Sequence, residues 1–243
     1  MKKSSAKLSL SRALAGDLVA ASRILALHEV LDAYGHVSAR CDRRPGHFVM
    51  SRALAPALVT ATDLVEYDAD SEPLAGERRK GFIERYIHGE IYRARPEVMA
   101  IVHSHAAAVI PFGVSRTRLR PVYHMGSFLW SGAPVFDMRE FRQENDLLVR
   151  NRALGAALAG SLGACSCVLM RGHGMTVVGE TIPEAVYRAI YTDMNARLQL
   201  QAASLEGPLE FLSDTEGRLA TAANRGTFER PWELWKRELL GRK

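Results

Sequence analysis

The sequence predicts an α/β fold in which helices pack on both faces of a mixed β-sheet. Short β-branched apolar runs alternate along the 243 residues with longer segments of helical periodicity. Glycine and proline separate many of these segments. Hydrophobic residues make up 47% and charged residues 24% of the chain, a balance typical of globular proteins, and the length allows a substantial core.

Seven short segments have the composition and length of β-strands. In chain order the predicted strands are 35–40, 47–51, 64–68, 98–105, 133–137, 167–170 and 175–178. The first two surround a turn at Pro45-Gly46, and residues 52–56 between the second and third form a loop or a short helix. The runs at 98–105 and 167–170 are the most apolar, which is typical of buried strands.

Four segments have helical periodicity and recognisable ends. The predicted helices are 9–34, 82–95, 147–162 and 181–205. Gly35 and Gly163 can cap the C-termini of the first and third helices. Pro96 stops the second helix, because a residue before proline disfavours the helical conformation. Thr181 caps the start of the fourth, with a proline in its first turn.

We expect a single domain over residues 1–243, with a flexible N-terminus at 1–8 and a C-terminal extension at 207–243. The extension is predicted to be irregular up to an amphipathic piece that carries Trp232 and Trp235. This apolar piece would suit a packed subunit interface.

The stretch from Val98 to His105 is the most informative part of the chain. Five consecutive apolar residues lead into His103, Ser104 and His105. Side chains two apart on a strand share a face, so the two imidazoles would project together from the strand end. They would form two corners of a divalent-metal site, or they would simply hydrogen-bond to backbone and water.

A second motif, Gly172-His173-Gly174, follows another buried strand. Its glycines permit a sharp turn and close backbone approach, so the motif is either a plain hairpin turn or the carrier of a third imidazole. Three protein ligands with an open position are the catalytic arrangement for zinc. Upstream, Glu84 and His88 lie four residues apart and share a helix face, which would also suit a solvated pair.

Taken in order, these motifs resemble those of the class II aldolase/adducin family over about residues 10–205. The matching pieces are Gly35 to Arg40, Glu84 to Tyr92, Ala100 to His105, and Arg171 to Gly174. The resemblance implies a three-layer αβα sandwich with a central mixed, largely antiparallel sheet. It also implies a homotetramer with the active site at a subunit interface. The implied ligands of a divalent cation are His103, His105 and His173, and Glu84 matches the family's acid/base residue. Zinc is the expected metal, with manganese, cobalt and iron open.

Departures from the family pattern bear on the substrate. Sugar-phosphate aldolases of the family hold phosphate with small and amide residues in three loops, where this chain has Gly35-His36, Ser51-Arg52 and Phe82-Ile83. A phosphorylated sugar is therefore disfavoured. Arg52 and Lys80 would pair with a carboxylate or serve as plain surface charge, and Phe82 and Tyr123 suggest a flatter, more apolar substrate. The predicted substrate-binding residues are His36, Ser38, Arg52, Lys80 and Phe82.

This combination, with Tyr123-His124-Met125, resembles the family's decarboxylase branch. The implied function is a metal-dependent lyase that decarboxylates a hydroxylated aromatic carboxylate, such as dihydroxyphthalate, or a carboxylated ring-cleavage product, through a metal-stabilised enolate. The candidate catalytic residues are Glu84, His88, Tyr123 and His124, and the general acid stays open among Glu84, His88 and His124. Three alternatives also stay open: an aldolase or dehydratase on a small hydroxy-carbonyl substrate, a metal-dependent oxygenase, and a non-catalytic adducin-like interaction domain.

Net charge and cysteine content limit the expected binding partners and the expected cellular compartment of the protein. The net charge is +5 and the pI is about 9.3, but no basic stripe interleaved with aromatic residues indicates nucleic acid, so a small anionic substrate is expected. Three cysteines without framework spacing favour a reducing compartment. No apolar run reaches membrane-spanning length and no signal peptide is recognisable, so we expect a cytoplasmic protein without a membrane partner.

Overall fold

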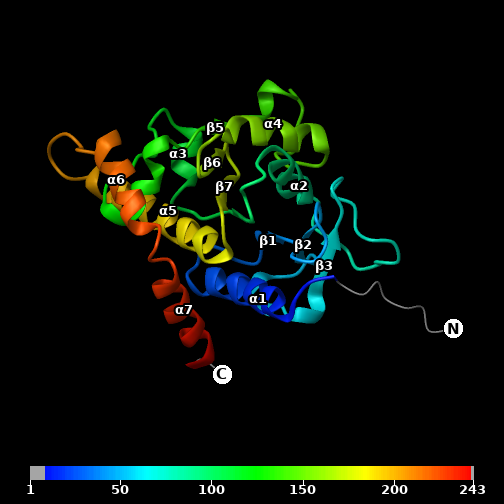
Figure 1. Ribbon diagram of the computed structural model, residues 1–243. Coiled ribbons are helices and arrows are strands. Elements are labelled where there is room, and N and C mark those ends of the chain that lie inside the picture. The colour runs from blue at the N-terminus through cyan, green and yellow to red at the C-terminus, as the bar shows by residue number, and fades with distance from the viewer. Residues whose placement is uncertain (1–8, 242–243) are drawn as a thin grey trace.

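The computed structural model describes residues 9–241, and these form a seven-stranded sheet between layers of helices (Figure 1). The strands are β1 (His36–Arg40), β2 (Phe48–Ser51), β3 (Leu64–Tyr67), β4 (Ala100–Ser104), β5 (Val135–Phe136), β6 (Cys167–Met170) and β7 (Gly174–Gly179). The helices are α1 (Arg12–Leu27), α2 (Arg85–Ala94), α3 (Ile110–Val114), α4 (Arg152–Leu162), α5 (Ile182–Ala202), α6 (Asp214–Asn224) and α7 (Glu229–Gly241). The flexible terminus expected at 1–8 lies outside the described residues.

The strand order in the sheet is β3-β2-β1-β4-β7-β6-β5. Every neighbouring pair is antiparallel except β5 and β6, which run parallel. The sheet is therefore mixed, as the residue pattern predicted, and largely antiparallel, as the family resemblance implied. β4 lies at its centre, so the strand that carries His103 is hydrogen-bonded on both sides.

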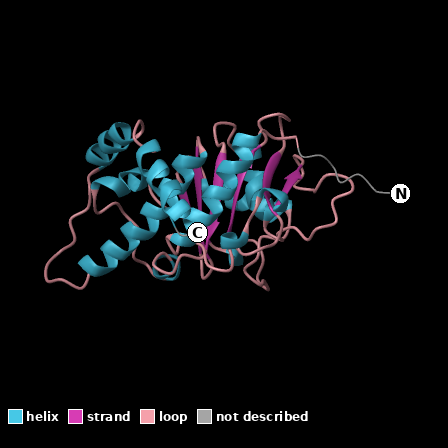
Figure 2. Ribbon diagram, turned by 90° about the horizontal axis from the view of Figure 1, so that it is seen from below, coloured by secondary structure: helices cyan, strands magenta, loops and turns pink. Residues whose placement is uncertain are grey.

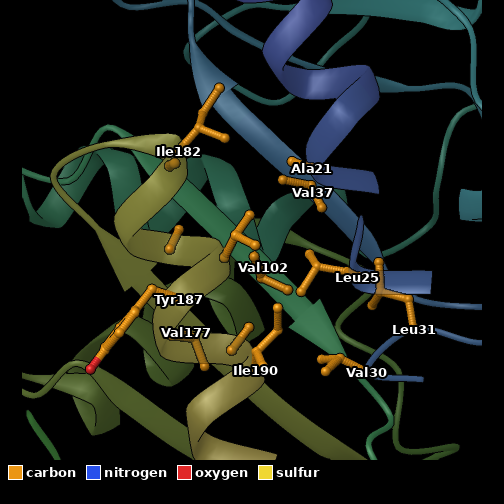
Figure 3. Packing of buried hydrophobic residues seen from close by; sticks show 14 of the residues in the cluster. Ala21, Leu25, Val30, Leu31, Val37, Val102, Val177, Ile182, Tyr187 and Ile190 are labelled. Carbon is orange, nitrogen blue, oxygen red and sulfur yellow. The ribbon is translucent and has the colours of Figure 1, made fainter. Parts of the chain in front are cut away.

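Helices cover both faces of the sheet, which confirms the three-layer αβα architecture (Figures 1 and 2). On one face, α1 and α5 pack on alternate side chains of β1, β4 and β7, among them Val37, Val102 and Val177 (Figure 3). On the other face, α2 and α4 enclose a second core that includes Ile101 and Val178. Alternation along each strand thus fixes which helical layer a given side chain meets.

The first helix is shorter than predicted. α1 ends at Leu27, and Glu29 adopts a positive φ of 58°, which turns the chain away from the helix axis. Gly35 is therefore not the cap of this helix. It has a φ of +84° and leads directly into β1, where an added Cβ would lie 2.9 Å from the His103 carbonyl oxygen. Leucine periodicity alone did not reveal this break.

The chain beyond Gly207 is more regular than predicted. Ser213 and Glu216 form a capping box at the start of α6, in which each side chain accepts a hydrogen bond from the other residue's backbone N–H. Trp232 and Trp235 of α7 are buried in the same core as α1 and α5. These tryptophans pack within their own chain, so they do not supply the subunit interface for which the sequence suggested them.

No helix formed by residues 9–241 combines the length and the apolar character needed to cross a membrane.

Replacing Trp235 by alanine should lower the free energy of unfolding by about 3–5 kcal/mol, because a buried aromatic side chain is lost from the α1/α5/α7 core. Its ring centroid lies 5.2 Å from that of His28. Urea unfolding followed by circular dichroism measures the change. Leu234→Ala, at an exposed neighbour on the same helix, should shift stability by no more than about 0.5 kcal/mol. Equal effects of the two substitutions would contradict the packing described for α7.

Candidate active site

The pleat of β4 decides on which side of the sheet the histidines lie. Ala100 and Val102 face the α1/α5 core, whereas Ile101 faces the α2/α4 core. His103 follows the parity of Ile101, so its fully buried side chain points toward α2 and α4. The candidate site therefore forms between the end of β4 and the helical layer made by α2 and α4.

Three imidazoles meet at this point. His105 follows β4 directly, and its Nε2 lies 3.2 Å from Nε2 of His103. His173 stands in the tight turn between β6 and β7, with its Nε2 2.9 Å from Nε2 of His105. The turn needs glycine at position 174, because an added Cβ would lie 2.0 Å from the Ser104 carbonyl oxygen. The Gly-His-Gly motif thus brings the third ring close to the end of β4.

Backbone carbonyls select the tautomer of two of these rings. His103 Nδ1–H donates to the Met175 carbonyl at 3.1 Å, and His173 Nδ1–H donates to the Leu147 carbonyl at 2.7 Å. Because a carbonyl can only accept, the proton of each neutral ring is on Nδ1 and the Nε2 lone pair is free. Leu147 presents its carbonyl from a left-handed conformation, with φ 64°.

This donor set fits a divalent cation. A tetrahedral zinc ion bound at about 2.0–2.1 Å separates neighbouring nitrogens by roughly 3.3–3.4 Å, close to the spacings found here. Burial, together with the nearby imidazoles of His103 and His173, lowers the pKa of His105 to about 4, so the ring is neutral near pH 7, as a metal ligand must be. A single cation bound among the three lone pairs would relieve their mutual repulsion.

Glu84 completes the cluster. Its Oε1 accepts a hydrogen bond from the Val149 N–H at 3.0 Å, and its Oε2 lies 3.5 Å from His103 Nε2 and 3.4 Å from His173 Nε2. Burial acts to raise the pKa of this carboxyl, but positive charge at His103 and His173, whether a proton on Nε2 or a cation bound there, outweighs burial and holds the pKa below its usual range. Glu84 is therefore a carboxylate. One donor atom from each of the four residues lies within 4.8 Å of the others.

A cavity of about 400 Å³ opens beside this cluster. Glu84, His103 and His105 form part of its wall. Phe82 and His36 form another part, with ring centroids 4.5 Å apart, and Lys80 brings an ammonium group. The remaining lining residues include the apolar side chains Leu54, Ile83 and Leu148 and the exposed ring of Tyr34. The space is thus bounded by rings and aliphatic groups on one side and by the histidine cluster on the other.

Comparison with known proteins identifies the family. Residues 16–200 match the model described as the Class II Aldolase and Adducin N-terminal domain. The chain belongs to the class II aldolase and adducin family.

Two curated proteins that are similar in sequence to this chain are named as decarboxylases. Decarboxylase tropJ from Talaromyces stipitatus is 44% identical over 91% of this chain and 92% of its own length. The 3,4-dihydroxyphthalate decarboxylase from Arthrobacter keyseri is 31% identical, with 90% of each chain covered. This class II aldolase-family protein is therefore an enzyme of the lyase class.

Solved structures show the same fold. An aldolase II superfamily protein from Pseudomonas syringae superposes with a TM-score of 0.79, at 22% identity and with 93% of this chain and 92% of that chain covered. The three-layer sandwich found here is thus shared within the family.

Some residues predicted for the site lie outside the cavity. Ser38 and His88 are completely buried behind His36. The spacing of Glu84 and His88 also allowed a solvated pair, but the buried His88 side chain rules that pair out. Arg52 is held by Asp63, its Nε donating to Oδ1 at 2.7 Å, and does not line the cavity.

The predicted catalytic pair Tyr123 and His124 also lies elsewhere. His124 opens a 3₁₀ helix (His124–Ser131) that packs on α6, and its carbonyl accepts from the Asn224 side chain at 3.2 Å. The Tyr123 hydroxyl is buried without a hydrogen-bond partner among the described residues, and burial raises the pKa of this phenol. Within one chain, the structure does not bring either side chain to the histidine cluster.

The cluster is anchored by a loop that the helical periodicity of the sequence did not reveal. We predicted a helix from residue 147, but α4 begins at Arg152 because Asn151 caps it by accepting from the Leu154 N–H. The preceding residues form a loop whose Leu147 carbonyl and Val149 N–H hold His173 and Glu84. Asn151 is a recognisable N-cap signal and would have located the helix start.

Replacing His103 by alanine should weaken binding of zinc by more than about tenfold, because one of three converging nitrogens is removed. Titration of the metal-free protein with a zinc buffer, together with elemental analysis, measures the affinity and stoichiometry. His124→Ala is the matched control, since this exposed ring lies outside the cluster, and its metal content should equal that of the wild type. Unchanged zinc affinity in His103→Ala would exclude the cluster as the metal centre.

Proposed function

We propose that the protein is a metal-dependent decarboxylase of hydroxylated aromatic carboxylates or of carboxylated ring-cleavage products. His103, His105 and His173 would hold the divalent cation, with zinc as the first candidate. The observation that carries the proposal is the convergence of three Nε2 atoms beside a cavity with ring-lined walls and one ammonium group.

The lining of the cavity supports an aromatic anion as the substrate. Phe82 and His36 can stack against a flat ring, while Lys80 can pair with a carboxylate. The Arg52 guanidinium forms a salt bridge with Asp63 and does not line this space. Among the described residues, Lys80 is therefore the cationic side chain in the cavity wall. The names of the two decarboxylase relatives point the same way.

The bound cation would supply Lewis-acid stabilisation of the negative charge that develops on substrate oxygen when carbon dioxide leaves. Of the three residues proposed as the general acid, Glu84 alone lines the cavity in the described chain. As a carboxylate it accepts the proton of a substrate hydroxyl and then donates this proton to the ring carbon that bears the carboxylate. Carbon dioxide leaves from this protonated carbon, and the electrons of the broken bond pass to the substrate oxygen as a phenolate. The product phenolate afterwards takes a proton from water, which balances the reaction.

Two other activities would use the same site. Aldol cleavage also needs charge stabilisation on an oxygen next to the broken bond, so the ligand set alone does not separate it from decarboxylation. A three-histidine site can also hold iron for oxygen chemistry. A non-catalytic interaction domain would not need three converging imidazoles, so we favour catalysis.

We further propose a homotetramer in which each cavity is completed by a neighbouring copy. The position of His124 outside its own cavity, with an exposed ring, supports this arrangement, since His124 would then act in the cavity of an adjacent subunit.

The zinc-loaded enzyme should release carbon dioxide, and no aldehyde, from an ortho-hydroxylated aromatic carboxylate. A panel that includes 3,4-dihydroxyphthalate and L-fuculose 1-phosphate, assayed for carbon dioxide, aldehyde and oxygen consumption, distinguishes the activities. Glu84→Gln should lower the rate by about 100-fold or more because the proton-transfer group is lost. Glu97→Gln removes an exposed carboxylate and should retain the wild-type rate. Aldehyde release or oxygen uptake would replace the proposal with the corresponding alternative.

Mixing two inactive variants should restore activity if subunits share their sites. His103→Ala destroys the proposed metal centre, and His124→Ala removes the exposed ring proposed to act in the neighbouring cavity. Co-refolded tetramers then contain some cavities with both groups intact. Mixtures without any recovered activity, or a monomer by analytical ultracentrifugation, would refute the shared site.

A further inference from the structure

Behind the cavity, four buried side chains form a continuous hydrogen-bonded chain. His36 Nδ1 lies 2.7 Å from His88 Nε2, His88 Nδ1 lies 2.6 Å from Ser38 Oγ, and Ser38 Oγ lies 2.8 Å from Tyr92 Oη. His36 and Ser38 are two apart on β1, while His88 and Tyr92 are four apart on α2. Each pair therefore shares a face, and the two faces meet.

Only one direction of these hydrogen bonds gives every proton in the series an acceptor. The Tyr92 hydroxyl has Ser38 Oγ as its only hydrogen-bond partner among residues 9–241, so Tyr92 donates to Ser38. The single Ser38 proton then goes to His88 Nδ1, and His88 Nε2–H donates to His36 Nδ1. The opposite direction would leave the buried Tyr92 proton without an acceptor in the described structure, which is costly.

This direction determines what His36 presents to the substrate. Because its Nδ1 accepts from His88, the neutral ring carries its proton on Nε2. Nε2 has no hydrogen-bond partner in the described chain, and the ring lines the cavity beside Phe82 and His103, with centroids 4.5 Å and 5.0 Å away. An N–H donor is thus left for a ligand in the cavity.

We propose that His36 is a dedicated hydrogen-bond donor to a carboxylate oxygen of the substrate, and that His88, Ser38 and Tyr92 are positioning residues that hold its tautomer. The choice of carboxylate rests on the proposed function, whereas the tautomer does not. His88 accordingly acts through His36 and does not touch the substrate.

The fixed donor gives selectivity against ligands that lack the carboxylate. A donor in a largely buried site loses its hydrogen bonds to water when a ligand enters, so a ligand without an acceptor at that point leaves it unpaired. A hydrogen bond to a charged group changes affinity by roughly ten- to hundredfold. We therefore expect zinc-loaded protein to bind 3,4-dihydroxybenzoate more tightly than catechol by a factor in this range.

Neutron diffraction of the zinc-loaded protein tests the hydrogen-bond direction without any assay of activity. We expect a deuteron on His36 Nε2 and none on its Nδ1, with deuterons on His88 Nε2, on Ser38 Oγ toward His88, and on Tyr92 Oη toward Ser38. A deuteron on His36 Nδ1, or two deuterons on this ring, would overturn the assignment.

Calorimetric affinities for 3,4-dihydroxybenzoate and catechol test the role of the donor. His36→Phe keeps a ring against Phe82 but has no N–H, so its preference for the carboxylate should fall by at least about tenfold. His36→Gln restores an N–H donor and should recover part of the preference. Tyr86→Phe removes a hydroxyl from the same helix α2 outside the chain of four and should leave the preference unchanged.

The outcomes separate the two proposals. If wild-type protein bound both probes equally while the neutron map showed Nε2–D, the carboxylate assignment would fail and the tautomer would stand. An undiminished preference in His36→Phe would overturn the donor role. If the wild-type protein decarboxylated none of the substrates tested but kept its preference for the carboxylate, only the proposed reaction would be contradicted.

Discussion

The candidate site depends on two backbone carbonyls. Met175 and Leu147 accept the Nδ1 protons of His103 and His173, which turns both Nε2 lone pairs toward His105. Without these acceptors the rings could rotate or exchange tautomers, and three histidines in one region would not form a defined donor set. The order of the cluster therefore comes from β7, which carries Met175, and from the loop before α4, which carries Leu147.

The register of the sheet also places His36 beside this cluster. His36 on β1 pairs with His103 on β4, and His103 pairs with Thr176 on β7. The ring proposed to face the substrate and the ring proposed to bind the cation thus lie on adjacent central strands. Since register is set by burial on both faces, a shift of one residue would move His36 and His103 into the α1/α5 core.

The two faces of the sheet differ in whether their helices also supply polar side chains to the candidate site. The face covered by α1 and α5 carries an apolar core, closed at its edge by the tryptophans of α7. The face covered by α2 and α4 also has an apolar core, but α2 supplies Glu84 just before its first turn and His88 and Tyr92 from its interior. One helix therefore provides a cavity carboxylate and the buried partners of His36.

The sequence by itself determined the fold class, the sharing of a face by His103 and His105, and the family, because these follow from local periodicity and ordered motifs. Tertiary structure decided which long-range partner each polar side chain met. It placed Asp63 on Arg52, put His88 behind His36, and separated Tyr123 from the cavity of its own chain. Strand and helix periods fix the direction of a side chain, whereas its partner depends on which distant segments pack beside it.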